Sequence, residues 1–188
     1  TWLAPKLTNA MQAGMRMDVV DPRLSKTAEK AEKWVPVEPG ADAALAMGIA
    51  RWIIDHDRHD VDYLRNPSQA AAETDGEPTW SDATHLVQVD AETQPKVRAS
   101  DLGPVAGDAD DADEFVVVDA ETAELAPASD ADSGVLSVDF TVDGKRVVSA
   151  WQLYHERGFE HTVAEYADMA GVERSRIAEE ADDFKRHG

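Results

Sequence analysis

One stretch of the chain, residues 42–56, carries apolar residues at the spacing of a helix. The spacing is i, i+3, i+4, i+7 and i+8, which places them on one face, and they are Leu45, Gly48, Ile49, Trp52 and Ile53. The preceding Pro39-Gly40 turns the chain into this segment. We therefore expect an amphipathic helix over residues 42–56 that packs against a core.

Shorter apolar runs precede this helix. Leu7 to Ala13 is expected to form a short helix, which Gly14 ends. Met17 to Val20 is expected to be a strand that ends at Asp21-Pro22, because proline cannot donate to a sheet ladder. Trp34 to Val37 is a second extended segment. This order predicts an α/β layer around a parallel sheet that sequence outside this chain continues.

Beyond Gly76 the pattern changes to short extended runs separated by acidic loops. The expected strands are Leu86 to Val89, Phe115 to Val118, Val135 to Val142 and Arg146 to Val148. Asp143-Gly144 favours the positive φ angles of a tight hairpin turn. The word Val-Asp-Ala-Glu-Thr occurs at residues 89–93 and 118–122, and its different surroundings favour two analogous turns over a duplication.

The last part of the chain returns to helix. Thr162 to Glu165 has the pattern of a capping box at the start of a helix. Earlier in the chain, Val61 to Leu64 is expected to form one helical turn. Gly171 ends the helix that follows, and another helix is expected from about Arg174 to Lys185. The predicted fold class is α/β, with an α/β part in residues 1–76, a β-rich insertion with acidic loops in 77–150 and C-terminal helices in 151–188.

The charge is strongly acidic. Lys and Arg number 18 against 38 Asp and Glu, which gives a formal net charge of −20, and Asp outnumbers Glu by 23 to 15. This excess argues against nucleic acid or an anionic membrane as a partner. The composition resembles that of proteins from salt-loving archaea, since molar salt screens carboxylate repulsion to a Debye length of about 3 Å. A merely acidic protein of low-salt origin is the alternative.

The sequence shows no cysteine, no membrane-spanning apolar stretch and no visible signal peptide. It contains no cysteine, so disulfides, thiolate metal sites and cysteine nucleophiles are excluded within these residues. Its longest unbroken apolar stretch, Ala43 to Ala50, is well short of the roughly 20 residues of a spanning helix. No signal peptide is visible at Thr1, and we expect a segment that starts in the middle of a domain.

Three charged residues carry candidate nucleotide chemistry. A carboxylate at the carboxyl end of an α/β strand, such as Asp21, can accept from ribose hydroxyls. Arg23 can offer paired donors to a phosphate, and Asp42 can accept from the N1 and N2 donors of a guanine. The alternative is that Asp21-Pro22 is only a turn and Asp42 only a helix N-cap.

The same residues carry a family resemblance. A strand that ends in Asp21-Pro22-Arg23, followed by Ser25, and a Trp-x-Pro-x-x-Pro-Gly-x-Asp-x-Ala-Leu segment over residues 34–45 resemble the molybdopterin oxidoreductase (dimethyl sulfoxide reductase) family. The resemblance implies a Rossmann-like parallel-sheet layer that holds the guanosine end of a molybdopterin guanine dinucleotide. It assigns cofactor contacts to Asp21, Pro22, Arg23, Ser25, Gly40 and Asp42, with no catalytic residue and no metal ligand in this chain. Ala41 departs from the family's usual threonine.

Later segments resemble the tetrathionate reductase branch of that family. These segments are Trp80 to Val87, Arg98 to Gly103, Val147 to Leu153 and Thr162 to Gly188. The resemblance implies a piece of a catalytic subunit that reduces tetrathionate to thiosulfate. A polysulfide, thiosulfate or arsenic-oxyanion enzyme, or a nucleotide-binding module without redox chemistry, remains an alternative.

The resemblance also implies what lies outside these residues. The family's iron–sulfur cysteines and its metal-ligating side chain normally precede this region, so the isolated chain is expected to be inactive. An iron–sulfur electron-transfer subunit and a membrane anchor subunit are the implied partners. The implied location is the extracytoplasmic face of the membrane, without a direct span in this chain.

The remaining motifs are interpreted without catalytic roles. His56 and His59 are expected to form a solvated helix end and not a metal site. The acidic run from Asp108 to Asp113 lacks the complete calcium-loop pattern and is expected to be a charged loop. The aromatic residues Trp151, Tyr154 and Tyr166 are expected in the core, whereas His155 and His161 are expected at the surface or in packing contacts.

Overall fold

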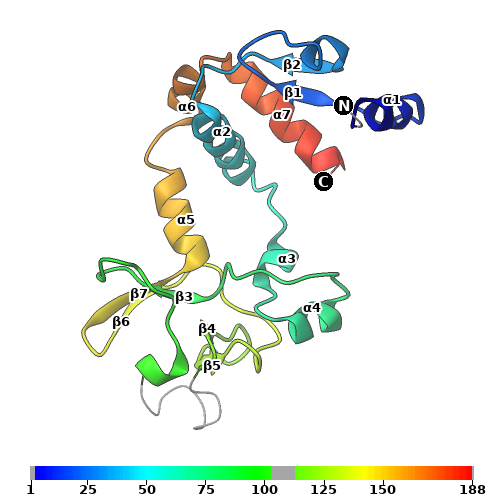
Figure 1. Ribbon diagram of the computed structural model, residues 1–188. Helices are drawn as coiled ribbons and strands as arrows, with labels where there is room; N and C mark the ends of the chain where they lie inside the picture. Colours follow the sequence, from blue (N-terminus) through cyan, green and yellow to red (C-terminus); the bar gives the residue numbers. More distant parts are fainter. Residues whose placement is uncertain (1–2, 103–112, 188) are drawn as a thin grey trace. The chain divides into compact units, whose positions relative to one another are not determined.

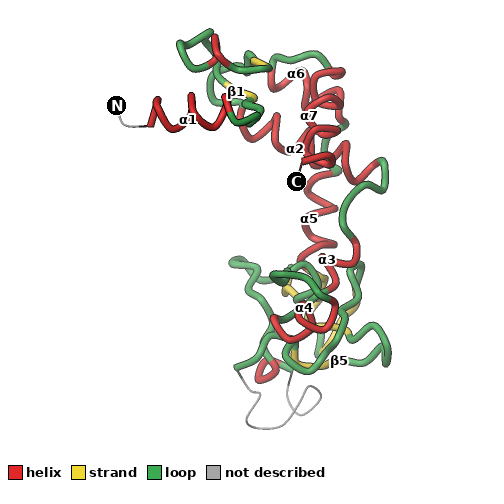
Figure 2. Tube along the Cα trace, turned by 90° about the vertical axis from the view of Figure 1, so that its right-hand side faces the viewer, coloured by secondary structure: helices red, strands yellow, loops and turns green. Residues whose placement is uncertain are grey.

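The computed structural model describes residues 3–102 and 113–187. It contains two compact units: unit 1 comprises Thr1–Arg58 and Gly158–Gly188, and unit 2 comprises His59–Arg157. These limits differ from the expected boundaries at residues 76 and 150. The helices after residue 158 belong with residues 1–58, because their apolar faces pack on the helix that starts at Asp42. Helices dominate unit 1, and loops with short strands dominate unit 2 (Figure 2).

Unit 1 is a small α/β assembly (Figure 1). Its elements are α1 (Leu3–Gln12), β1 (Asp18–Val20), the 3-10 helix η1 (Ala28–Lys30), β2 (Lys33–Val35), α2 (Asp42–Asp55), α6 (Val163–Ala170) and α7 (Arg174–His187). β1 and β2 are parallel, and Val20 pairs with Val35. The predicted helices and strands of this part are confirmed within a few residues. A two-stranded pair is a small sheet, and the Rossmann-like layer remains a prediction.

The core of unit 1 joins β2 to three helices. Its buried residues come from both segments of the unit and are Val35, Val37, Leu45, Val163, Tyr166, Ala167, Ala170 and Ile177. Gly48 permits the close approach of α2, because a Cβ there would lie 2.7 Å from Ile177 Cδ1. Residues more than 100 positions apart thus form one core.

Helix termini in unit 1 follow the sequence signals. The capping box before α6 is confirmed: Glu165 N donates to Thr162 Oγ1 over 3.2 Å, and Thr162 N donates to Glu165 Oε2 over 2.7 Å. Gly171 ends α6 in the left-handed region with φ +69°. The carboxylate of Glu165 has a lowered pKa because it accepts from the Thr162 backbone N–H and hydroxyl.

Unit 2 is mainly antiparallel. Its elements are α3 (Val61–Arg65), α4 (Gln69–Asp75), β3 (Leu86–Gln88), the 3-10 helix η2 (Ala99–Asp101), β4 (Val116–Val118), β5 (Leu125–Pro127), β6 (Asp139–Val142), β7 (Lys145–Ser149) and α5 (Ala150–Gly158), which reaches the boundary with unit 1. The order in one sheet is β3-β7-β6, and β4 pairs with β5 in another. The mixed α/β class with small sheets and C-terminal helices is therefore confirmed.

The turns of unit 2 confirm the local sequence signals. Asp143 and Gly144 have φ angles of 48° and 75° and connect β6 to β7. Gln94 and Ala123, which follow the two Val-Asp-Ala-Glu-Thr words, have φ angles of 44° and 59°. The two words form analogous turns, as predicted, and a residue with positive φ follows each of them.

Some elements of unit 2 differ from the prediction. The expected strand 135–142 begins only at Asp139. Val135 N donates to Val118 O, whereas Val138 O accepts from Ser149 N. Residues 135–138 therefore cross from one sheet to the other. The sequence pattern does not indicate α4, whose alanine-rich run has no apolar stripe, or β5, which ends in a proline. Tyr154 is 40% exposed on α5, so its assignment to the core was wrong. Asp108, Asp110 and Asp111 lie outside the described residues.

Candidate functional site

The backbone of Asp21 is fixed at the carboxyl end of β1. Its N–H donates to Val35 O over 3.2 Å and so extends the β1–β2 ladder by one residue. Its carbonyl accepts from the indole Nε1 of Trp34 over 2.7 Å. Two neighbours on β2 thereby hold the residue that follows β1, which is where α/β folds bind nucleotides.

The Asp21 carboxylate also organises the turn after β1. Its Oδ1 accepts from the N–H of Arg23 over 2.9 Å. That backbone bond, with a second bond from the Ser25 hydroxyl, lowers the pKa of Asp21. The group is therefore an ionised acceptor at neutral pH. The turn interpretation of Asp21-Pro22 is also met, because such a carboxylate-to-backbone bond defines an Asx turn.

Ser25 and Arg23 differ in how the fold uses them. Ser25 Oγ accepts from Ala28 N over 3.3 Å, and Glu29 N donates to Ser25 O over 2.8 Å, so this serine holds the first two residues of η1. The exposed guanidinium of Arg23 makes no ion pair within residues 3–102 and 113–187. Ser25 thus supports the turn, while Arg23 presents its donors to solvent.

A tight turn places Asp42. Ala41 N donates to Glu38 O over 3.0 Å around Pro39-Gly40, and the φ of Gly40 is +84°. Positive φ at the third position of such a turn requires glycine or a residue that tolerates the left-handed region. Glu38 N in turn donates to Ala170 O over 2.9 Å. The end of α6 therefore positions the loop that precedes Asp42.

Asp42 is the first residue of α2, and Ala41 is the N-cap, without a side-chain capping bond. The alternative interpretation of Asp42 as the N-cap was therefore wrong by one residue. A carboxylate in the first turn is favoured by the partial positive charge of the helix N-terminus. Asp42 is exposed, which leaves its side chain accessible to a ligand.

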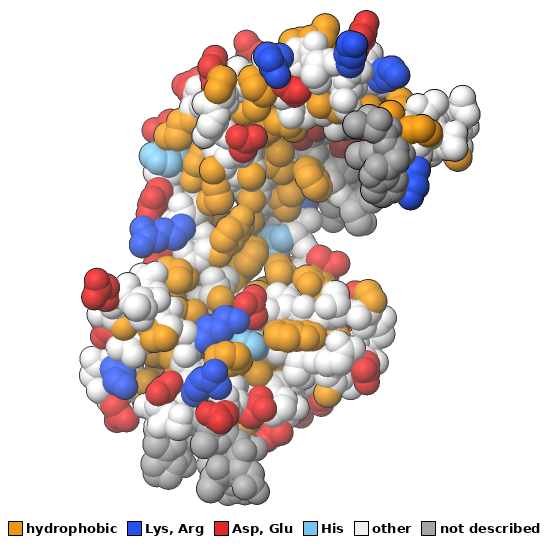
Figure 3. Space-filling view, in the orientation of Figure 1, with side chains coloured by type: hydrophobic (Ala, Val, Ile, Leu, Met, Phe, Trp, Pro, Cys, Tyr) orange, Lys and Arg blue, Asp and Glu red, His pale blue; other side chains and the backbone are white. Residues whose placement is uncertain are grey.

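Asp42 borders an apolar groove along α2. The groove has a volume of about 460 Å³, and its lining residues are Val20, Asp42, Leu45, Ala46, Ile49, Ala50, Ile53, Glu180 and Phe184. Figure 3 shows apolar side chains gathered around α2 in unit 1. Val20, at the end of β1, and Asp42 share this groove, whereas Asp21 is not among its lining residues. The groove therefore brings Asp42 together with the end of β1 but not with Asp21.

Sequence reasoning missed Glu180 in the wall of this groove. Glu180 is only 6% exposed, and its Oε1 is buried without a hydrogen-bond partner among the described residues. Burial raises its pKa, an effect that Lys33 partly offsets with its Nζ 4.0 Å from Oε1. The signal was present in the sequence, because Glu180 lies on the helical face of Ile177 and Phe184.

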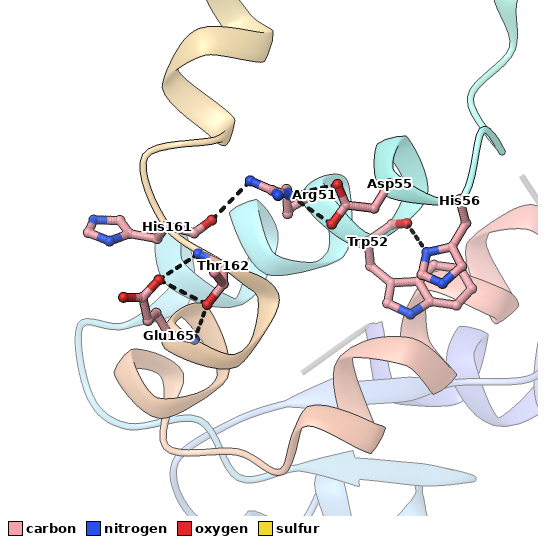
Figure 4. A network of polar contacts seen from close by, with 7 residues as sticks. All are labelled: Arg51, Trp52, Asp55, His56, His161, Thr162 and Glu165. Carbon is pink, nitrogen blue, oxygen red and sulfur yellow. Dashed lines mark hydrogen bonds and ion pairs between the residues drawn. The ribbon is translucent and has the colours of Figure 1, made fainter.

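Other polar residues of unit 1 form local contacts along α2 and at the start of α6 (Figure 4). Arg51 donates to both carboxylate oxygens of Asp55, over 2.9 Å and 2.8 Å, and to His161 O over 3.3 Å. His56 Nδ1 lies 2.8 Å from Trp52 O, and its ring stacks on that indole at 4.1 Å. His56 is the exposed C-cap of α2, as the helix-end interpretation predicted. No group of three potential metal-ligating side chains occurs in the described parts of the chain.

Comparison with known proteins gives several relatives over most of this chain. No family model matches. The chain is 37% identical to a selenate reductase subunit of Mesobacillus selenatarsenatis over 97% of its own length and 18% of the relative. The corresponding values for a tetrathionate reductase subunit of Salmonella typhimurium are 33%, 83% and 16%. For a putative dimethyl sulfoxide reductase catalytic subunit of Halobacterium salinarum they are 30%, 94% and 19%. The chain thus spans less than a fifth of each relative.

Proposed function

We propose a cofactor-anchoring function for this chain, which belongs to the molybdopterin oxidoreductase family of the dimethyl sulfoxide reductase type. In this proposal it holds the guanosine end of a molybdopterin guanine dinucleotide. The observation that carries the proposal is the placement of Asp42 and Val20 on one groove at the carboxyl end of β1. Nucleotides bind in α/β folds at that end of the strands.

The residues present fit such a ligand. Asp42 offers an accessible acceptor to the N1 and N2 donors of a guanine, and the apolar groove beside it suits the face of a base. Asp21 offers an ionised acceptor to ribose hydroxyls, and Arg23 offers donors to a phosphate oxygen. Pro22, Ser25 and Gly40 shape the two turns that carry these groups. The cofactor supplies the redox chemistry when bound, and these residues bind and orient it.

For the intact protein we propose two-electron reduction of an oxyanion. The sequence segments after residue 80 favour tetrathionate, which would be reduced to thiosulfate. Selenate is the second candidate, because the relative named for selenate matches nearly the whole chain at 37% identity. Polysulfide, thiosulfate and arsenic oxyanions remain alternatives, because the residues that support this proposal contact a nucleotide and not the substrate.

We also propose a cofactor, partners and a location for the intact protein. We propose that an iron–sulfur cluster lies outside this chain and that an iron–sulfur subunit and a membrane anchor subunit deliver electrons at the extracytoplasmic face. The described residues contain no helix of the length and apolarity that a membrane crossing requires. The net charge of −20 supports the proposal that the protein functions at high salt concentration. We expect the chain to be more compact and more stable there than in dilute buffer, because salt screens the repulsion between its carboxylates.

Calorimetry with guanosine monophosphate tests the anchoring role. We expect Asp42→Asn to weaken binding by about tenfold, since one charge-assisted pair contributes about 1.5 kcal/mol or more. Asp168→Asn is a matched control, because Asp168 is an exposed carboxylate on α6 of the same unit. Adenosine monophosphate, which lacks the N1 and N2 donors, should bind more weakly than the guanine nucleotide. Equal affinities for both nucleotides, or equal effects of the two variants, would contradict the proposal.

A nucleotide-binding module without redox chemistry is the second candidate. Metal analysis and a reduced-dye assay separate the two functions. We expect neither molybdenum, iron nor reductase activity in the 188-residue chain, and both metals with activity in the longest natural polypeptide that contains it. A metal-free long polypeptide that binds guanine nucleotides would favour the module.

A further inference from the structure

Trp80 is a large aromatic side chain that unit 2 leaves 41% exposed. The loop that carries it is fixed by two hydrogen bonds. Tyr63 Oη donates to Trp80 O over 3.2 Å, and Ser81 N donates to Asn66 O over 3.0 Å. An exposed tryptophan held in one position is typical of an interface anchor, because it offers a large contact area at a low cost in conformational entropy.

Trp80 forms one end of an aromatic row with His85 and Phe115. The ring centroids of Trp80 and His85 lie 5.7 Å apart, and those of His85 and Phe115 lie 5.4 Å apart. His85 is only 2% exposed, and burial lowers the pKa of its imidazole, so the middle of the row is uncharged at neutral pH. Two cations lie over the ring at the other end: Lys96 Nζ is 5.2 Å and Arg98 Cζ 4.8 Å from the Phe115 centroid. The Phe115 end therefore already holds cations through its aromatic face.

The Trp80 end of the row has no such cation. In residues 3–102 and 113–187, no lysine or arginine lies over the indole ring. The segment 60–75 carries one arginine, Arg65, and four exposed carboxylates, which are Asp60, Asp62, Glu73 and Asp75. This segment contacts the Trp80 loop, since Tyr63 lies on α3 and holds the Trp80 carbonyl. An aromatic ring on an acidic part of the surface favours a cationic ligand.

The charge of the chain is divided unequally between its units. Unit 2 contains 22 Asp and Glu against 6 Lys and Arg, a formal charge of −16, whereas unit 1 contains 16 against 12, a formal charge of −4. Such a charge disfavours nucleic acid, an anionic membrane and a second copy of this chain as partners of unit 2. A positively charged polypeptide segment is the class of partner that both the charge and the aromatic ring favour.

We propose that the exposed face of Trp80 docks an arginine or lysine side chain from a basic segment of a separate partner polypeptide. The cation would lie over the Trp80 ring as Lys96 and Arg98 lie over Phe115, and the carboxylates of residues 60–75 would attract the rest of the segment. The two hydrophobic clusters of unit 2 lie wholly within residues 86–147, so Trp80 is not an unfilled part of its core. The surface does not depend on nucleotide binding, because Asp42 and its groove belong to unit 1.

High salt separates this contact from a general attraction between opposite charges. At molar salt the Debye length is about 3 Å, so carboxylates that do not touch the segment contribute little, whereas a guanidinium in contact with the indole stays bound. The probe is a fluorescein-labelled peptide of about five Arg-Gly repeats, added to the 188-residue chain in dilute buffer and in molar potassium chloride. Fluorescence anisotropy gives its affinity.

Trp80→Ala and Tyr154→Ala are a matched pair, since the native side chains are 41% and 40% exposed in unit 2. We expect Trp80→Ala to weaken peptide binding about fivefold or more at both salt concentrations and Tyr154→Ala to leave it unchanged. Trp80→Phe should retain part of the affinity, whereas Trp80→Leu, which is apolar but has no aromatic face, should lose as much as Trp80→Ala. Unchanged circular dichroism of the four variants shows that they fold. Equal effects of the two alanine variants, full affinity of Trp80→Leu, or binding that molar salt abolishes would overturn the proposal.

Hydroxyl-radical footprinting distinguishes a separate partner from another part of the same polypeptide. We expect Trp80 to be oxidised at a similar rate in the 188-residue chain and in the longest natural polypeptide that contains it, as read by peptide mass spectrometry. The Arg-Gly peptide should slow this oxidation in both. Protection of Trp80 in the long polypeptide alone, or protection that rises with the concentration of the 188-residue chain, would overturn the proposal. Guanosine monophosphate should leave both the oxidation rate and the peptide affinity unchanged, and a change in either would contradict the independence of the two surfaces.

Discussion

Units 1 and 2 differ in how their sheets and cores are assembled. Unit 2 is a continuous stretch, and its sheets are antiparallel pairs within His59–Arg157. Unit 1 combines two segments about 100 residues apart and leaves a strand edge, Val20 and Phe184 exposed. The difference indicates that local hairpins build much of the sheet structure of unit 2, whereas the core of unit 1 requires helices from a distant segment of the chain.

The buried polar groups of the units differ as well. His85 in unit 2 is 2% exposed, and its Nε2 donates to Pro67 O over 3.0 Å, because a carbonyl can only accept. Its ring lies 5.7 Å from that of Trp80 and 5.4 Å from that of Phe115. Unit 1 instead buries the carboxyl group of Glu180 beside Lys33. One unit thus buries a neutral base and the other an acid.

The largest expected effect is the loss of close packing in unit 2. A Cβ at Gly134 would lie 2.6 Å from both Cβ and Oγ1 of Thr84, which is fully buried and branched at Cβ. We expect Gly134→Ala to lower the free energy of unfolding of unit 2 by about 3 kcal/mol. Gly158→Ala is the control, because its Cβ would meet only Met47 Cε at 3.6 Å. Hydrogen exchange should locate the loss in unit 2; equal loss in both units would contradict their separation.

Two helix-ending glycines provide the next comparison. Gly171 in unit 1 and Gly76 in unit 2 have φ angles of +69° and +83°, so alanine at either site costs about 1 kcal/mol. A Cβ at Gly171 would also overlap Glu38 Cγ, whereas a Cβ at Gly76 would have no described atom within 4 Å. We expect Gly171→Ala to cost about 2 kcal/mol in thermal unfolding and to weaken guanosine monophosphate binding. Equal costs for both variants would show that Glu38 moves freely.

A smaller effect is expected at the helix contact of unit 1. Alanine at Gly48 would place its Cβ 2.7 Å from Ile177 Cδ1 and 3.1 Å from Tyr166 Cβ. Overpacking costs up to about 3 kcal/mol, but the flexible end of Ile177 can shift, and alanine favours a helix over glycine by about 1 kcal/mol. We therefore expect a net loss of about 1 kcal/mol in unit 1, measured by thermal unfolding. A more stable Gly48→Ala would mean that α2 packs less tightly on α7 than described.

The smallest effects are opposite pH dependences of the two units. Burial lowers the pKa of His85, so below about its ordinary value of 6.5 the unfolded state binds the proton more readily, and unit 2 loses stability as pH falls. Burial raises the pKa of Glu180, so the folded state retains its proton above the ordinary value of 4.5, and unit 1 loses stability as pH rises. His85→Phe should remove the loss of stability of unit 2 as pH falls. Glu180→Gln should remove the loss of stability of unit 1 as pH rises.

Thermal midpoints of the wild type and both variants between pH 4.5 and pH 7 measure these slopes. Each variant is compared with the wild type at the same pH, because many other carboxylates titrate in this range. Asp21 and Glu165 illustrate the need for this comparison: their pKa values are lowered by hydrogen bonds, so both favour the folded state as pH rises. Parallel pH profiles for wild type and variant would contradict the assigned burial.

The sequence by itself determined the features that depend on neighbouring residues. The α2 face follows from its apolar spacing, the capping box from Thr162 and Glu165, and the hairpin from Asp143-Gly144. Local hydrogen bonds and backbone sterics fix each of them within a few residues. The ordered motif over residues 20–45 likewise indicated the family that the relatives confirm.

Only the tertiary structure decided which distant segments meet. The sequence did not show that α6 and α7 complete the core of residues 1–58, that Ala170 O positions the loop before Asp42, or that Glu180 is buried in a groove beside β1. Each of these features depends on contacts across more than 100 positions. Such contacts are set by the packing of whole elements, which a local pattern of hydrophobic and polar residues does not specify.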